Sequence, residues 1–276
     1  KRIMAVLNTE TSIENHPGNA QTDSGSGEHS VIFEHVDFVY PDGEEAVLKD
    51  ISFSAKSGET VAFIGSTGSG KSSLIQLIPR FYDRASGNIY IDGQKIEDLD
   101  INALRSKIGF VPQKAHLFSG TIEENIRFGK PDATMDEIIH AAKIAQAYDF
   151  IMEKPHQFQE QIVEGATNVS GGQKQRLSIA RALIRKPEIY IYDDSFSALD
   201  FKTDARLRKA LKPEIKNAIV FLVAQRVSTI LDADKIVVLD EGKIAGIGTH
   251  RELLASCPIY YEIAASQLSK EELTYA

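Results

Sequence analysis

The clearest candidate for chemistry is the stretch GSTGSGKS, which fits the spacing G-x-x-x-x-G-K-[ST] between an apolar strand pattern and a helical pattern. Its glycines let the backbone approach an anion closely, and the amides of the loop and of the following helix then point at that anion. We expect Lys71 to reach the β- and γ-phosphates of a nucleotide and the Ser72 hydroxyl to ligate Mg²⁺. The expected phosphate loop is Gly65, Ser66, Thr67, Gly68, Ser69, Gly70, Lys71, Ser72 and Ser73.

A second stretch, IYIYDD at residues 189–194, ends four apolar or aromatic residues with two carboxylates, Asp193 and Asp194. A buried strand that delivers two acids at its tip indicates a use for them. One acid could hold a metal ion and the other could act as a base.

The third stretch is NVSGGQKQRLSIARAL at residues 168–183. Ser170 is expected to cap a helix whose buried face carries Leu177, Ile179, Ala180 and Leu183. Two glycines in the first turn cost helix stability, so a plain surface helix does not account for Gly171 and Gly172. A helix start with exposed amides and a serine hydroxyl is a further phosphate site.

The elements that must position these residues are short apolar strands. VIFEHVDFVY alternates like a strand, with one slip in register, and AVLKDISFSA follows it after a turn signal. TVAFIG, NIYIDG, KIGFVPQ, EIYIYDD, AIVFLVA and KIVVLD are further strand candidates, and KSSLIQLI predicts a helix that ends near Pro79. Strands buried on both faces that alternate with helices indicate a parallel sheet, and the early hairpin indicates an antiparallel annex.

The composition is that of a globular protein, with 276 residues, 42% hydrophobic and 25% charged. The net charge of −8 argues against a general binder of nucleic acid or anionic membranes, which would carry a basic surplus. Cys257 is the single cysteine, so a reducing compartment fits. The longest apolar run, at 218–224, is far shorter than the roughly 18 residues of a membrane span.

Residues 8–30 contain little that could be buried and predict a linker or mobile tail. Folded sequence is expected to begin at Val31. Because the chain opens on lysine, we expect it to be a piece of a longer protein.

Over about residues 31–268 the sequence closely resembles the nucleotide-binding domains of ABC transporters. SGGQ at 170–173 looks like their signature motif, GSTGSGKS like their Walker A loop and IYIYDD like their Walker B strand. Gln113 in FVPQ resembles the glutamine of their Q-loop, and SALD, ending at Asp200, resembles their D-loop. LFSGTIEENI at 117–126 is similar to the exporter branch.

The resemblance implies an α/β fold: a P-loop NTPase (RecA-like) core with a mostly parallel sheet, an antiparallel β subdomain and an α-helical subdomain. The ATP-binding domain would span 31–268, with the helical subdomain at about 115–185. Residues 1–30 would be a linker from a missing transmembrane domain, with KRIMAVL as the end of a transmembrane-domain helix, and 269–276 would be a C-terminal tail.

The resemblance also implies ATP and Mg²⁺ as cofactors. Asp193, Ser72 and Gln113 would hold Mg²⁺, and Gln113 would also touch the attacking water. Tyr40 lies where this family stacks an aromatic ring on adenine, and Glu164 in the segment that contacts the membrane domains. The expected partners are those transmembrane domains and a second ABC nucleotide-binding domain, not nucleic acid.

Members of this family form head-to-tail dimers in which each ATP lies between one chain's phosphate loop and the other chain's SGGQ. The expected location is the cytoplasmic face of the inner membrane, as part of a transporter, with this fragment itself soluble.

Two positions depart from the family pattern. Asp194 stands where a glutamate usually activates water, and it is shorter by one methylene, about 1.5 Å along the chain. Gln225, in VAQRVST, stands where a histidine is usual, and glutamine can neither become a cation nor relay a proton. We therefore predict a slow site that holds ATP, in a heterodimer whose partner carries the glutamate and the histidine.

Two alternatives remain open at this point. One is a homodimer with two slow but active ATPase sites, and the other is a mainly regulatory ATP clamp. A soluble ATPase of DNA repair or translation is disfavoured, because the expected coiled coil and the second ATPase domain are both missing from this sequence.

Overall fold

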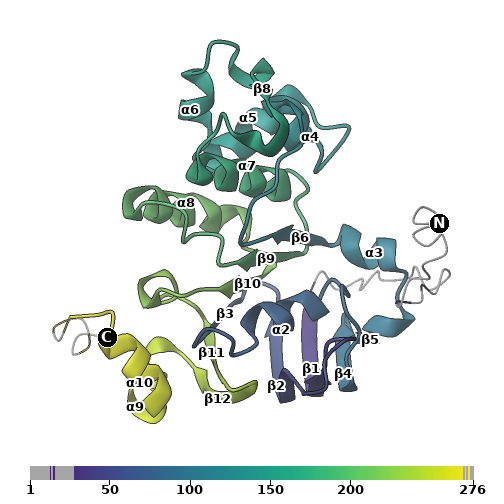
Figure 1. Ribbon diagram of the computed structural model, residues 1–276, viewed down its shortest axis with the longest axis vertical. Coiled ribbons are helices and arrows are strands. Elements are labelled where there is room, and N and C mark those ends of the chain that lie inside the picture. Colours follow the sequence, from purple (N-terminus) through teal and green to yellow (C-terminus); the bar gives the residue numbers. More distant parts are fainter. Residues whose placement is uncertain (1–12, 14, 16–27, 270, 272, 274–276) are drawn as a thin grey trace.

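The computed structural model describes residues 13, 15, 28–269, 271 and 273. The predicted linker at 1–30 and tail at 269–276 therefore lie largely outside the described residues. Figure 1 shows two sheets in the lower part of the molecule and a helical lobe above them. Among the described residues, no helix combines the length and the apolar character that a membrane crossing needs.

An antiparallel sheet has the strand order β2-β1-β4-β5, which confirms the predicted antiparallel annex. Its first strand shifts register between Phe33 and Val36, where His35 has a φ of 50°. This bulge keeps Phe33 and Val36 on the same buried face, so the predicted slip is confirmed. The strands are β1 (Ser30–Phe38), β2 (Leu48–Lys56), β4 (Ser86–Ile91) and β5 (Gln94–Lys95).

The larger sheet has the strand order β12-β11-β3-β10-β9-β6, and all its neighbours are parallel except β11 and β12. The mostly parallel sheet expected of a P-loop NTPase fold is thereby confirmed. The sequence did not reveal the edge strand β12, KIAGIG, which is only half covered along its length. The strands are β3 (Thr60–Gly65), β6 (Ile108–Val111), β9 (Ile189–Asp193), β10 (Ile219–Val223), β11 (Lys235–Asp240) and β12 (Lys243–Gly248).

The central strands β3, β9 and β10 alternate between two hydrophobic cores. Val61 and Phe63 of β3 face a core shared with the antiparallel sheet and helix α2 (Lys71–Leu77). Ala62 and Ile64 face a second core, which the helices on the other side of the sheet complete. Burial on both faces explains why these strands are continuous apolar runs in the sequence.

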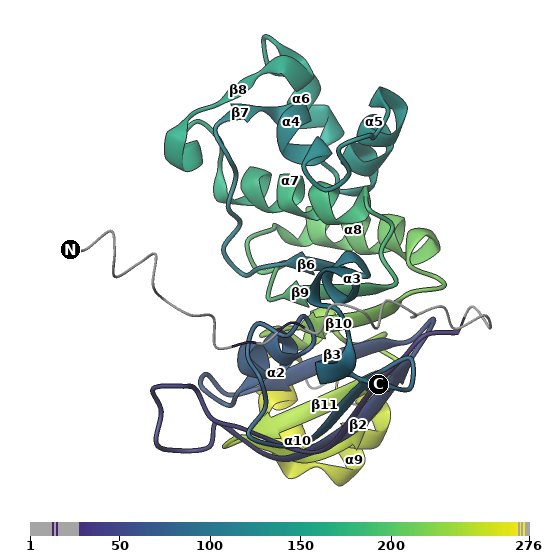
Figure 2. The ribbon, with the colours of Figure 1, turned by 90° about the vertical axis from the view of Figure 1, so that its right-hand side faces the viewer.

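The helical lobe is formed by residues between β6 and β9 and extends upward from the larger sheet in Figures 1 and 2. Its elements are β7 (Gly120–Thr121), α4 (Ile122–Arg127), α5 (Met135–Ile144), α6 (Tyr148–Met152), η2 (Gln157–Gln159), β8 (Gln161–Ile162), η3 (Glu164–Ala166) and α7 (Gly171–Leu183). The remaining helices are η1 (Ile96–Asp98), α3 (Ile101–Ser106), α8 (Phe201–Glu214), η4 (Val227–Thr229), α9 (His250–Ser256) and α10 (Pro258–Ala265).

Candidate functional site

The site lies where the parallel strands β3, β9 and β10 end side by side. The loop that follows β3 packs so tightly at Gly65 and Gly70 that neither position has room for a side chain. A Cβ atom on Gly65 would lie 2.0 Å from the backbone oxygen of Leu239. One on Gly70, where φ is +97°, would lie 2.6 Å from Leu48 Cδ2. The two glycines thus allow the loop to pack directly against Leu239 and Leu48.

The first turn of α2 is open to an anion. Gly70 occupies the N-cap position of α2, so no side chain caps the helix start. The Lys71 ammonium donates hydrogen bonds to the backbone oxygens of Gly65 (2.9 Å) and Ser66 (2.7 Å), which holds it across the loop. Burial lowers the pKa of Lys71, while the carboxylates of Asp194 and Asp193 oppose this shift.

Asp193 ends β9 and accepts a 2.8 Å hydrogen bond at Oδ1 from the Ser72 hydroxyl. Burial and the neighbouring Asp194 raise the pKa of Asp193, against the opposing effects of Ser72 and Lys71. A carboxylate and a hydroxyl side by side offer the oxygen ligands that Mg²⁺ prefers. The residues present therefore fit a magnesium ion.

Asp194 is held between two glutamines. Its Oδ2 accepts hydrogen bonds from Gln225 Nε2 at 2.7 Å and from Gln113 Nε2 at 3.2 Å. The backbone has a φ of 45°, and its amide donates to the Val223 oxygen at 3.0 Å. Burial raises the pKa of Asp194, against a lowering by hydrogen bonds from Ser197 and Gln113. A short carboxylate is thus turned toward two amide donors.

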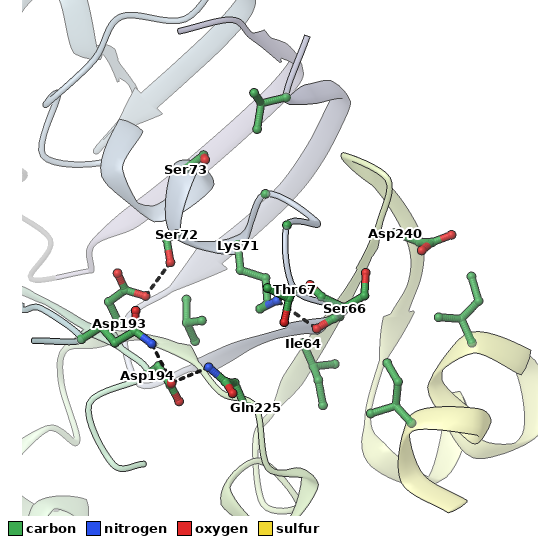
Figure 3. A pocket seen from close by; sticks show the side chains of 18 of the residues that line it. Ile64, Ser66, Thr67, Lys71, Ser72, Ser73, Asp193, Asp194, Gln225 and Asp240 are labelled. Carbon is green, nitrogen blue, oxygen red and sulfur yellow. Dashed lines mark hydrogen bonds between the residues drawn. The ribbon is translucent and has the colours of Figure 1, made fainter. Parts of the chain in front are cut away.

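These residues line one cavity of about 890 Å³, in the range of small-molecule sites. Figure 3 shows Ser72, Asp193, Asp194 and Gln225 near one another, with Asp240 on the far side beside the C-terminal helices. The lining residues that the sequence did not indicate are Val47, Ile64, Val223, Asp240, Ile259, Glu262, Ile263, Ser266 and Gln267. Ile64, Val223 and Asp240 carried a signal, because each lies at or next to the end of a predicted strand of the same sheet.

Tyr40 and Ser69 are not among the lining residues of this cavity. The Tyr40 hydroxyl lies 2.9 Å from Ser73 Oγ, and its ring packs edge-on against Phe38 and Tyr82. Ser69 is buried, and its Oγ accepts a hydrogen bond from Lys71 Nζ at 3.3 Å. Adenine stacking by Tyr40 stays a prediction.

The expected signature lies in the helical lobe, and none of its described residues lines the cavity. Ser170 caps α7 reciprocally: Ser170 Oγ accepts from Gln173 N, and Gln173 Oε1 accepts from Ser170 N. Asp200 caps α8 and accepts from Thr203 N at 2.9 Å. Glu164 is exposed on η3. The structure therefore unites the phosphate loop with Gln113, the two aspartates and Gln225, but not with the signature.

Comparison with known proteins identifies the architecture. Residues 48–197, more than half of the chain, match the family model described as ABC transporter. The chain belongs to the ABC transporter family. GSTGSGKS and IYIYDD, the Walker A and Walker B candidates, both fall inside the matched range.

The relatives are about twice as long as this chain. An uncharacterised ABC transporter ATP-binding protein of Bacillus subtilis, YfiB, is 46% identical over 98% of this chain, which covers 46% of that protein. A Staphylococcus aureus protein, whose name describes a candidate multidrug export ATP-binding/permease protein, is 45% identical over 96% of this chain and is likewise 46% covered. The chain thus spans about half the length of these curated relatives.

A solved structure of a bacterial Atm1-family ABC exporter with ATP bound superimposes on this ABC domain with a TM-score of 0.90. It is 34% identical in sequence, and the match covers 98% of this chain and 47% of the exporter chain. Nearly the whole described structure therefore corresponds to one half of an exporter polypeptide.

Proposed function

We propose that this chain is the ATP-binding motor domain of an ABC exporter and that its own ATP site hydrolyses slowly. ATP would bind between two such domains arranged head to tail, and the closure of the dimer would drive export. The other domain is a different chain that carries the usual glutamate and histidine. The cavity of about 890 Å³ lined by the phosphate loop and Asp193 supports ATP binding.

The observation that carries the slow site is the double hydrogen bond on Asp194 Oδ2. A general base must lie within hydrogen-bond reach of the proton that it takes. Asp194 is one methylene shorter than glutamate, and a misplacement of about 1 Å can cost about a hundredfold in rate. The Gln225 side-chain amide already donates a hydrogen bond to Asp194 Oδ2, and it has no titratable proton to relay.

The binding half of the reaction uses other residues. The loop amides and Lys71 would hold the β- and γ-phosphates, and Ser72, Asp193 and Gln113 would hold Mg²⁺. Bound Mg²⁺ supplies positive charge that offsets the charge of the phosphates. Since none of these groups depends on the length of Asp194, tight ATP binding and slow hydrolysis are compatible.

The proposal of a second ABC domain is supported by Gly171, which no contact within the described chain requires to be glycine. A Cβ on Gly171 would meet no atom of the described chain within 4 Å, apart from its neighbours and its own helix. Glycine in a helix is destabilising relative to alanine. We infer that the missing side chain makes room for a group of another chain. The phosphates bound by the partner are the group that an exposed, serine-capped helix start fits.

The membrane domains are proposed on the length of the relatives. This chain covers 46% of a protein whose name joins an ATP-binding part to a permease part. The exposed Glu164 on η3 is the proposed contact with those domains. The location that follows is the cytoplasmic face of the inner membrane.

The test is to repair the site. Asp194→Glu with Gln225→His should raise ATP hydrolysis by this chain about tenfold or more, measured as phosphate release with and without candidate partner domains. Adding Lys71→Met to the repaired chain is the matched control, since it should abolish the gain if turnover comes from this site. An unchanged rate in the repaired chain would contradict the proposal.

The unaltered chain distinguishes the alternatives. Turnover by the chain alone at the rate of the mixture would favour the homodimer with two active sites. Nucleotide-dependent dimerisation without hydrolysis in any mixture would favour the regulatory clamp.

A further inference from the structure

Gln267, just beyond α10, contacts the segment that carries Gln225. Its Oε1 accepts a hydrogen bond from Val227 N at 2.8 Å, and its Nε2 donates to the Gln225 backbone oxygen at 3.0 Å. We propose that Gln267 is a positioning residue, which fixes the backbone on both sides of Arg226 and thereby holds the Gln225 amide on Asp194. The inference rests on the proposed function, because it deepens the role of Gln225.

The geometry suits a side-chain amide. A glutamine amide offers one acceptor and donor groups on adjacent atoms, so it can pair with a backbone as another peptide group would. Here the paired groups are the carbonyl before Arg226 and the N–H after it. Both ends of the short segment from Gln225 to Val227 are therefore set by one side chain.

Helix α10, which precedes Gln267, is packed firmly against the rest of the protein. Tyr260 and Ala264 of α10 are completely buried, and the Tyr260 hydroxyl lies 2.7 Å from Nδ1 of the buried His250 on α9. The amides of Gln267 and Leu268 both donate to the Ala264 oxygen, which closes the turn after α10. The same C-terminal elements supply one wall of the cavity.

The segment makes two other contacts that depend on its position. The Gln225 side chain donates to Asp194 Oδ2 at 2.7 Å. The Arg226 guanidinium lies 5.1 Å from the centre of the exposed Phe201 ring, next to Asp200 at the start of α8. A shift of this backbone would therefore move both the Gln225 amide, which contacts Asp194, and the Arg226 guanidinium, which contacts Phe201 of α8.

The first test measures position without hydrolysis. In the chain with Gln225 and Asp194 unaltered, Gln267→Leu removes both hydrogen bonds at similar size. We expect the side-chain amide resonance of Gln225 to shift and the Val227 backbone amide to exchange at least about tenfold faster, while core strands keep their exchange rates. Gln267→Glu keeps the acceptor for Val227 and should preserve part of the protection. Ala265→Ser, on an exposed position of α10, is the matched control and should change neither signal.

The second test measures the effect of Gln267 on ATP hydrolysis. In the repaired chain with Asp194→Glu and Gln225→His, Gln267→Leu should lower kcat about tenfold and leave KM for ATP within about twofold. Gln267→Glu should fall between the two, and Ala265→Ser should match the parent.

The outcomes are separable. An unshifted Gln225 resonance in Gln267→Leu overturns the inference whatever the hydrolysis rates show. A shifted resonance with unchanged kcat in an active repaired chain also overturns it, because the contact would then be structural only. If the repaired chain gains no activity, the slow-site proposal fails, and the Gln225 and Val227 signals decide the inference by themselves.

Discussion

Two helix starts rich in glycine and serine, those of α2 and α7, are built differently. The start of α2 has a glycine at the N-cap, Lys71 folded across its loop, and a large cavity before it. The start of α7 has Ser170 and Gln173, which cap each other. Its first two residues, Ser170 and Gly171, are exposed, and it lines no part of that cavity in the described chain.

The difference indicates which site one chain can complete. At α2 no side chain in the described part of the chain caps the helix start, so an anion can accept hydrogen bonds from its first amides. At α7 the capping pair of Ser170 and Gln173 already satisfies two of the orphan donors, and Ser170 and Gly171 are exposed at the surface. This contrast supports our proposal that the first start binds the nucleotide of this chain and that the second faces a partner domain.

Exchanging a glycine of each region for alanine should show the largest contrast. Gly65→Ala should destabilise the protein by at least about 3 kcal/mol, because its Cβ would lie 2.0 Å from the Leu239 oxygen. Gly171→Ala should stabilise it by about 0.5 kcal/mol, because it meets open space in a helix. Urea denaturation of both variants measures the free energies of unfolding. Equal losses at the two positions would contradict the comparison.

Replacing one lysine in each region should show that the start of α2 contributes to ATP affinity and that the start of α7 does not. Lys71→Met should weaken Mg²⁺–ATP binding by about a hundredfold, or about 2.7 kcal/mol, since it removes the cation from the phosphate loop. Lys174→Met, on α7, removes only an exposed hydrogen bond to the Gly165 oxygen and should leave the affinity within about twofold. Titration calorimetry on the isolated chain provides the comparison. A loss of affinity in both would mean that α7 contributes to the chain's own site.

The smallest expected effect is on the capping pair. Ser170→Ala should lower the free energy of unfolding by about 1 kcal/mol, because the Gln173 amide loses its acceptor. The chain's own ATP affinity should not change, whereas hydrolysis in a mixture with an active partner domain should fall. Thermal denaturation, ATP titration and phosphate release test the three parts. An altered ATP affinity in the chain alone would mean that Ser170 contributes to this chain's own site, which would contradict the comparison.

The sequence predicted most of the elements for local reasons. The central residues VAFI of β3 and the strand IVFLV of β10 are buried on both faces, so each of them is apolar and the pattern is unambiguous. The edge strand β12 was missed, because its residues are partly exposed and two of its six are glycine. The helical lobe could be placed only as a region, since its short helices are separated by loops and 3₁₀ turns.

What the sequence determined by itself is the set of groups: a phosphate loop, two acids after a buried strand, and the unusual residues Asp194 and Gln225. Motif spacing encodes these, because the chemistry depends on neighbours within a few residues. Only the tertiary structure decided that Gln113 and Gln225 donate to one oxygen of Asp194 and that Gln267 holds the Gln225 segment. Those contacts join residues 31 to 81 positions apart, so they depend on how the strands and the C-terminal helices pack.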